Sequence, residues 1–150
     1  MAKNILAPVD GSNFMERNVK YACEMAKNMG SRLTLIHVVT VPAPIQAWSP
    51  SVAPEFPSEL GHLKKPLEDA ALDILDRAQH IARKHGVDSD TRLQTTYGNP
   101  AQAIIKFAEE HKSDLIVIGA KGHSLLRNLT VGSVCDTIVH NAPCAVFVVR

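Results

Sequence analysis

The sequence predicts an α/β protein: a single-domain three-layer sandwich in which helices cover both faces of a five-stranded, parallel, doubly wound sheet. The first observation is that short apolar runs alternate with longer segments whose apolar residues recur every three or four positions. The second is the resulting order β-α-β-α-β-α-β-α-β, which is typical of right-handed crossovers between parallel strands. The third is the length of 150 residues, which suits one domain, residues 1–150, with a substantial core.

The chain opens with a strand and a helix. Residues 5–9 are apolar on both faces, as a central parallel strand requires, and Pro8 is expected at the carboxyl end because proline cannot donate to a ladder. Ser12 is expected to cap a helix that runs to Met29, where Gly30 ends it. The buried face of this helix is predicted from apolar residues at steps of three and four: Met15, Val19, Ala22, Cys23 and Ala26.

A second strand, residues 33–39, leads into a segment of a different kind. Residues 40–58 carry five prolines and Trp48, and they are predicted to form an extended surface loop. Trp48 there either covers a pocket, touches a partner or packs the loop down. A long helix follows and ends near His85, with Pro66 either as its first residue or at a kink near its start. Its buried face is expected to hold Leu67, Ala71, Ile74, Leu75, Ala78 and Ala82.

The remaining elements complete the alternation. Residues 91–95 are more polar, so we expect a short strand nearer an edge of the sheet. Asn99-Pro100 is predicted to cap and open a helix. Residues 115–119 form a buried strand, the next helix ends near His140, and residues 144–149 form a last apolar strand. The first and fourth strands both end in sequences that suit a ligand, so we expect them to flank the point where strand order reverses.

The stretch from Asp114 to Ser133 combines a strand, glycines and a helix start. The glycines stand at Gly119, Gly122 and Gly132, immediately before Ser133. Helix N-termini carry unpaired N–H groups and the positive end of the dipole, and glycines let a backbone approach a ligand closely. The arrangement therefore predicts a phosphate site. The alternative is that these glycines serve only turns and the helix entry.

Composition and motifs argue against several classes of function. The net charge is +1 without a basic stripe, so no nucleic-acid partner is expected, and no apolar run approaches the roughly 18 residues of a membrane span. The chain contains no P-loop, no dinucleotide-binding glycine motif after the first strand and no nucleophile elbow. His80 and His85 lie about 140° apart around a helix, too far to share a zinc ion.

The cysteines indicate a reducing environment. Cys23, Cys135 and Cys144 are odd in number, form no C-x-x-C pair and lie in apolar contexts. This pattern predicts reduced, buried thiols in a cytoplasmic protein. The first apolar run is too short for a signal peptide, because Asp10 ends it.

At this point the residues carry a family resemblance. The opening strand and turn read ILAPVDGS, residues 98–122 read GNPAQAIIKFAEEHKSDLIVIGAKG, and the chain closes with APCAVFVVR. The spacing Gly119-x2-Gly122-x9-Gly132-Ser133 matches the pattern G-2x-G-9x-G-[S/T]. With these pieces the chain resembles the universal stress protein family along essentially its whole length, and the glycine spacing resembles that of its ATP-binding branch.

The resemblance implies a Rossmann-like sheet with strand order 3-2-1-4-5 and a site for ATP or another adenine nucleotide, with Mg²⁺. By position, the adenine pocket would be lined by Ala7, Pro8, Val9 and Val38. Asp10 would lie near the ribose or a metal ion held on the phosphates. The phosphates would lie in a cradle formed by Gly119, Gly122, Gly132 and Ser133, with His123 and Val134 beside it.

The resemblance also implies a homodimer. Val146, Val148 and Val149 belong to an apolar last strand, and an apolar edge strand favours pairing with a second copy about a two-fold axis. The alternative is a covered edge in a monomer.

Three functions remain open. The first is a nucleotide-binding module in stress response or signalling, in which ATP orders the glycine loop and changes what the dimer presents to partners. The second is a slow ATP hydrolase, although Asp10 is the only acid placed nearby and the motif offers no clear general base or arginine finger. The third is a nucleotide-independent interaction protein, which the intact glycines and Ser133 disfavour. Whether the protein is an enzyme therefore stays open, and the motif favours binding over catalysis.

Overall fold

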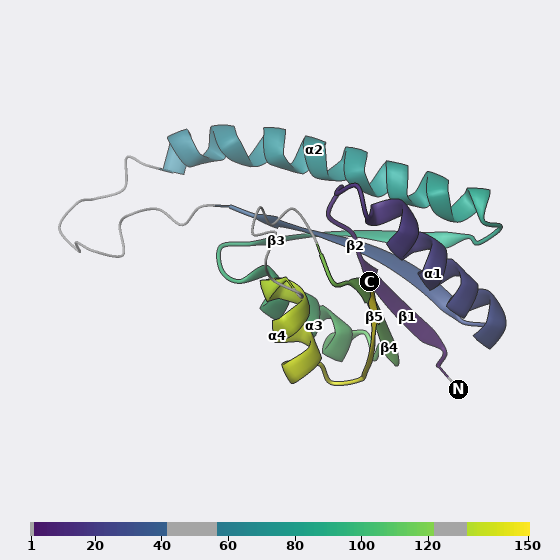
Figure 1. The fold of residues 1–150 in the computed structure, drawn as a ribbon. Helices are drawn as coiled ribbons and strands as arrows, with labels where there is room; N and C mark the ends of the chain where they lie inside the picture. The colour runs from purple at the N-terminus through teal and green to yellow at the C-terminus, as the bar shows by residue number, and fades with distance from the viewer. Residues whose placement is uncertain (1, 42–56, 122–131) are drawn as a thin grey trace.

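Five parallel strands form one sheet in the order β3-β2-β1-β4-β5 (Figure 1). The structure is a computed structural model that describes residues 2–41, 57–121 and 132–150. Every pair of neighbouring strands is parallel, so the predicted fold class and strand order are confirmed. The strands are β1 (Asn4–Pro8), β2 (Arg32–Thr40), β3 (Ser89–Thr96), β4 (Leu115–Gly119) and β5 (Ala145–Val149). Strand order reverses between β1 and β4, as predicted, and β3 is an edge strand.

Helices cover both faces of this sheet (Figure 1). The helices α1 (Met15–Met29) and α2 (Pro57–Lys84) lie on one face, and α3 (Pro100–Glu110) and α4 (Ser133–Asn141) lie on the other. The strands supply both cores because successive side chains point to opposite faces. In β1, for example, Ile5 and Ala7 pack under α1 and α2, whereas Leu6 packs under α3 and α4. No helix in the described ranges is long and apolar enough to cross a membrane.

The helix α1 begins two residues later than predicted, because the turn before it continues through Ser12. The Asp10 carboxylate accepts a hydrogen bond from the Ser12 amide at 2.9 Å, and Ser12 Oγ accepts one from the Phe14 amide at 3.3 Å. Ser12 therefore closes a turn, and Phe14 occupies the cap position. The predicted apolar face is buried, and Gly30 ends the helix at a left-handed φ of 64°, as expected.

The helix α2 begins earlier than the sequence suggested. Pro57 is its first residue and Thr40 belongs to β2, so the predicted loop over residues 40–58 is too long at both ends. Pro66 lies inside the helix and is not its first residue. The rest of that loop, including Trp48, lies outside the described residues. The expected buried face holds except at Leu67, which is 38% exposed.

The other elements agree with the sequence to within two residues. The Asn99 side chain caps α3 by accepting a hydrogen bond from the Ala101 amide at 2.8 Å, and Pro100 takes the first helical position. Pro8 ends β1, where its missing N–H interrupts no ladder. These short elements bring the carboxyl ends of β1, β2 and β4 to one side of the molecule.

Candidate functional site

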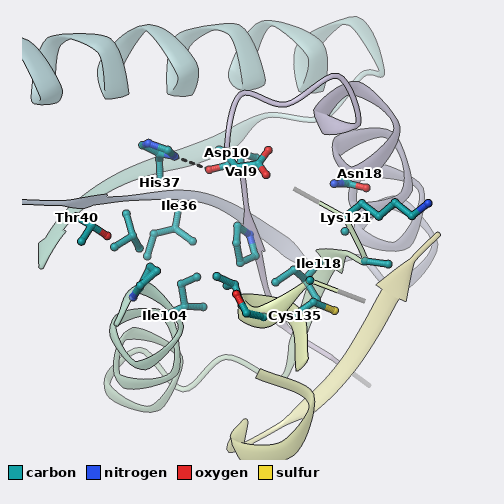
Figure 2. Close-up of a pocket in the computed structure, with 18 residues that line it drawn as sticks. Val9, Asp10, Asn18, Ile36, His37, Thr40, Ile104, Ile118, Lys121 and Cys135 are labelled. Atoms are coloured by element: carbon teal, nitrogen blue, oxygen red, sulfur yellow. Dashed lines mark hydrogen bonds between the residues drawn. The ribbon is translucent and has the colours of Figure 1, made fainter. Parts of the chain in front are cut away.

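A cavity of about 460 Å³ opens at the carboxyl ends of β1, β2 and β4, where the strand order reverses (Figure 2). In doubly wound sheets this is the place where ligands bind. The described lining comes from three strands, the turns that follow them, and the helices α1, α3 and α4. The lining residues are Pro8, Val9, Asp10, Asn18, Ile36, His37, Val38, Thr40, Pro100, Ile104, Ile118, Gly119, Ala120, Lys121, Gly132, Ser133, Val134 and Cys135.

The structure brings most of the predicted ligand residues to this one cavity. The predicted residues that line it are Pro8, Val9, Asp10, Val38, Gly119, Gly132, Ser133 and Val134. Ala7 does not line it, because its side chain is buried in the core beneath α1 and α2, with 2% exposed. Gly122 and His123 lie outside the described residues.

The end of β1 is tied to β2 by a histidine that the sequence did not single out. His37 Nδ1 lies 2.6 Å from the carbonyl oxygen of Val9 (Figure 2). A carbonyl oxygen can only accept a hydrogen bond, so Nδ1 carries the proton in this contact. His37 follows the same alternation as Leu33 and Leu35, which are buried under α1 and α2. The sequence signal that could have identified His37 is its position: it is a polar residue at an inward-facing place in an apolar strand.

The two described glycines of the motif differ in their surroundings. A Cβ added to Gly119 would collide with Nδ2 of Asn18, and it would lie 2.8 Å from Cγ and 3.0 Å from Oδ1 of the same side chain. Among the residues that the structure describes, the carbonyl oxygen of Ala120 is the one atom within 4 Å of a Cβ added to Gly132, at 3.4 Å. Gly119 therefore makes room for Asn18, whereas no described side chain lies beside Gly132.

The first turn of α4 faces the cavity without a side-chain cap. Gly132 is the N-cap residue and has no side chain to accept from the first amide groups, whereas α3 is capped by its own Asn99. The Gly132 amide donates to the carbonyl of Ala120 at 2.7 Å, which fixes the start of α4 against the end of β4. The exposed Ser133 follows as the first helical residue. Uncapped N–H groups at a helix start form a preorganised site for an anion.

The charges in the described lining are few. Among the described lining residues, Asp10 supplies the single acidic side chain and Lys121 the single lysine or arginine. No group of three or more His, Cys, Asp or Glu side chains is placed to hold a metal ion within residues 2–41, 57–121 and 132–150. Cys135 is buried in the wall, and burial raises the pKa of its thiol, so the thiol stays protonated at neutral pH.

The edge strand β5 lies next to β4, and its exposed side chains are not the valines that the sequence analysis assigned to the dimer edge. Val146 and Val148 are half-buried against the core beneath α3 and α4, and Val149 is 4% exposed. The side chains that β5 presents to solvent are those of Ala145 and Phe147, and the larger one, Phe147, is 37% exposed. The Phe147 ring centroid lies 6.2 Å from that of Tyr21 on α1. Any pairing through this edge would thus use the backbone of β5 and the aromatic ring of Phe147.

Fold and cavity together define a doubly wound α/β protein with a cavity at its switch point. The family model of the universal stress protein family matches residues 1–150. A universal stress protein of Methanocaldococcus jannaschii is 33% identical over 148 residues, which are 99% of this chain and 82% of that protein. The chain belongs to the universal stress protein family.

Solved structures agree with this assignment. The universal stress protein UspA from Lactobacillus plantarum superposes with a TM-score of 0.82 at 29% identity, covering 99% of this chain and 97% of that one. A universal stress protein from Archaeoglobus fulgidus was solved in complex with dAMP; it has a TM-score of 0.67 and 23% identity, over 99% of this chain and 98% of its own. Another was solved with cAMP, and one from Arabidopsis thaliana with AMP bound, with TM-scores of 0.68 and 0.60.

Proposed function

We propose that this protein binds adenine nucleotides in the cavity at its switch point and belongs to the ATP-binding branch of its family. The observation that carries the proposal is the convergence of Val38, Asp10 and the pair Gly132-Ser133 on one cavity from three separate segments. The dAMP, cAMP and AMP complexes of structural neighbours make an adenine nucleotide the ligand class to test first.

The two ends of the cavity suit the two ends of a nucleotide. Ile36, Val38 and Ile104 offer aliphatic surface near the end of β2, as a base requires. The uncapped first turn of α4 offers N–H groups and the positive end of a dipole, as phosphates require. The strip of backbone between them, from Gly119 to Lys121, lies along the path that the ribose and phosphates would take.

Magnesium would enter with the nucleotide. Mg²⁺ is usually bound through one or two carboxylates plus phosphate oxygens. Asp10 lines the cavity and supplies one such carboxylate, which fits a metal held mainly by phosphates. The Ser12 amide already donates to Asp10 Oδ1, so the carboxylate is held in one orientation.

The test is a calorimetric titration of the full chain with AMP, ADP and ATP, each with and without Mg²⁺. Gly132→Val adds a branched side chain at the start of α4, and we expect it to abolish binding while the far-UV circular dichroism stays that of the wild type. Gly98→Val is the matched control, because a Cβ there meets Thr96 Oγ1 at 3.8 Å and no other described atom within 4 Å, and Gly98 is not among the described lining residues. Unchanged affinity in Gly132→Val would refute the phosphate assignment.

The proposal extends to assembly and role: a homodimer that pairs through β5 and acts in stress response or signalling. It is supported by the edge position of β5 and by its exposed Phe147. The three free thiols support a reducing, cytoplasmic setting.

Sedimentation velocity tests the dimer, with Phe147→Glu expected to shift it to monomer. Leu72→Glu on α2 is the control, because Leu72 is also exposed, at 53%, but lies far along the chain from β5. Identical profiles for Phe147→Glu and wild type would exclude pairing through this edge.

A further inference from the structure

Asn18 is a polar residue on the apolar face of α1. It follows Met15 by three positions and precedes Ala22 by four, so it falls on the stripe that packs against the sheet. Only 9% of its surface is exposed. Its side chain lies against Gly119, the first glycine of the motif, and reaches the cavity at that point (Figure 2).

The Asn18 amide group makes no hydrogen bond to any residue that the structure describes. An asparagine side chain has two N–H donors and a carbonyl acceptor, and leaving them unpaired in a protein interior destabilises the folded state. Asn18 avoids full burial by opening onto the cavity, which it lines. Its polar group is therefore placed to serve a ligand.

A second cavity, of about 280 Å³, begins where the first one ends. The two cavities share Asn18, Ala120 and Lys121, so Asn18 stands at their junction. The second cavity also includes Arg17, the neighbour of Asn18 on α1, and it has no acidic side chain among its described lining residues. An amide donor beside a lysine and an arginine is a set of groups that binds phosphate.

The junction lies at the far end of the first cavity from the proposed base site. Figure 2 shows His37 and Thr40 at one end of the cavity and Asn18 and Lys121 at the other. A nucleotide with its base near Val38 and its first phosphates near Gly132 would point its terminal phosphate toward this junction.

We propose that Asn18, with Lys121 and Arg17, forms a subsite for the terminal phosphate of a nucleoside triphosphate. Asn18 donates Nδ2–H to a phosphate oxygen, and the two cations balance the added charge. The proposal rests on the proposed function, and it adds which nucleotide the site prefers: a triphosphate over a monophosphate. It also explains Gly119, whose missing Cβ admits the Asn18 side chain.

The experiment compares ATP and AMP binding, each with Mg²⁺, to wild type and to Asn18→Ala by calorimetry. Loss of one hydrogen bond to a charged phosphate lowers affinity about tenfold or more, so we expect that loss for ATP and a change within about twofold for AMP. Asn18→Asp keeps the size of the side chain but places a carboxylate beside the phosphate, and we expect it to weaken ATP binding further. Asn28→Ala is the matched control, an exposed asparagine on the same helix.

Each outcome decides the matter. An equal loss of AMP and ATP affinity in Asn18→Ala would place the contact elsewhere on the nucleotide and overturn the subsite. No loss of either would overturn it as well, while leaving the adenine site intact. Wild-type protein that binds neither nucleotide would overturn the proposed function and the subsite together. Inorganic triphosphate provides a separate arm: competition with ATP in wild type and reduced competition in Asn18→Ala supports the subsite.

Discussion

Gly119→Ala tests directly why the motif begins with a glycine. The added methyl group would occupy the place of the Asn18 amide, since its Cβ would collide with Nδ2 and lie 2.8 Å from Cγ. Ordinary van der Waals contacts of a Cβ begin near 3.4 Å. Gly119 does not adopt a left-handed φ, so an alanine there brings no backbone strain of its own. The contact with Asn18 is therefore the source of the destabilisation that we expect.

The expected destabilisation follows from that contact. Overpacking by one methyl group costs about 1–3 kcal/mol when neighbours must shift. The neighbour is a single side chain at the rim of two cavities, so it can rotate away, and we expect about 1–2 kcal/mol. For a chain of this length that corresponds to a fall in Tm of roughly 2–8 °C. If the rotated amide enters the first cavity, nucleotide affinity falls in the same variant.

Urea unfolding followed by circular dichroism measures this free energy in Gly119→Ala, Asn18→Ala and the double variant. Asn18→Ala alone should be near neutral or stabilising by about 0.5 kcal/mol, because alanine has the higher helix propensity. In the double variant the collision is gone, so its free energy of unfolding should return to that of Asn18→Ala. The coupling energy between the two sites should then be about 1–2 kcal/mol.

The control for this cycle is Gly132→Ala, where the Ala120 carbonyl oxygen, at 3.4 Å, is the one described atom that the new Cβ meets. Its effect should be small, and it should add to that of Asn18→Ala without coupling. Additive effects for Gly119→Ala and Asn18→Ala would refute the reasoning. They would mean that Gly119 is needed by the ligand or by β4 itself, and not by Asn18.

Two further predictions concern stability away from the site. Two backbone amides, those of Lys3 and Asn4, donate to Asp114 Oδ2 at 2.8 and 2.9 Å and hold the pKa of Asp114 below its ordinary value of 3.8. Because the pKa of Asp114 is lower in the folded protein, its carboxylate stabilises the fold above pH 3.8, and this stabilisation is lost as the pH falls through the folded pKa. Asp114→Asn should therefore lower the free energy of unfolding at neutral pH and match the wild type in strong acid. A difference in urea midpoint that does not change with pH would contradict this. Ser89 Oγ is buried without a hydrogen bond, the one such side-chain atom in the described ranges, so Ser89→Ala should raise the free energy of unfolding by about 1 kcal/mol. Ser31→Ala is the comparison, because it loses a hydrogen bond of 2.6 Å that Ser31 Oγ donates to the Ala2 carbonyl, and it should lower the free energy of unfolding. If urea unfolding shows a change of the same sign for Ser89→Ala and Ser31→Ala, the argument is rejected.

The order of helices and strands could be predicted from the sequence, because the spacing of apolar residues along the chain differs between a helix and a strand. Apolar runs predicted the strands. The residues that follow β1 and β4 suit ligand binding, which predicted that these two strands flank the switch point, as they do. The residue at which a helix starts depends on which hydrogen bonds form in the turn before it. Ser12 had the chemistry of a cap, but the Asp10 carboxylate holds it in a turn. Prolines suggested a loop up to Ser58, although Pro57 suits a first helical position and Pro66 is accommodated within α2.

The cavity was predicted on the side of the glycines and missed on the side of α1. Glycine spacing is visible in one segment of sequence, whereas Asn18 and His37 reach the cavity only because the fold brings α1 and β2 beside β4. Each of the two stands at an inward position of an otherwise apolar pattern. Such a residue in a core normally needs a partner, and His37 has one in the Val9 carbonyl.

Asn18 and Gly119 show why a glycine motif cannot be interpreted one residue at a time. Gly132 precedes a helix whose first amides are uncapped, so its role follows from the backbone around it. Gly119 has ordinary backbone geometry, and its missing side chain matters because a residue from another helix fills the space. The same spacing of glycines can therefore hold a phosphate with backbone groups alone or, as we infer here, with an added amide donor. On this proposal, the residue opposite the first glycine, on α1, sets how many phosphates the site prefers.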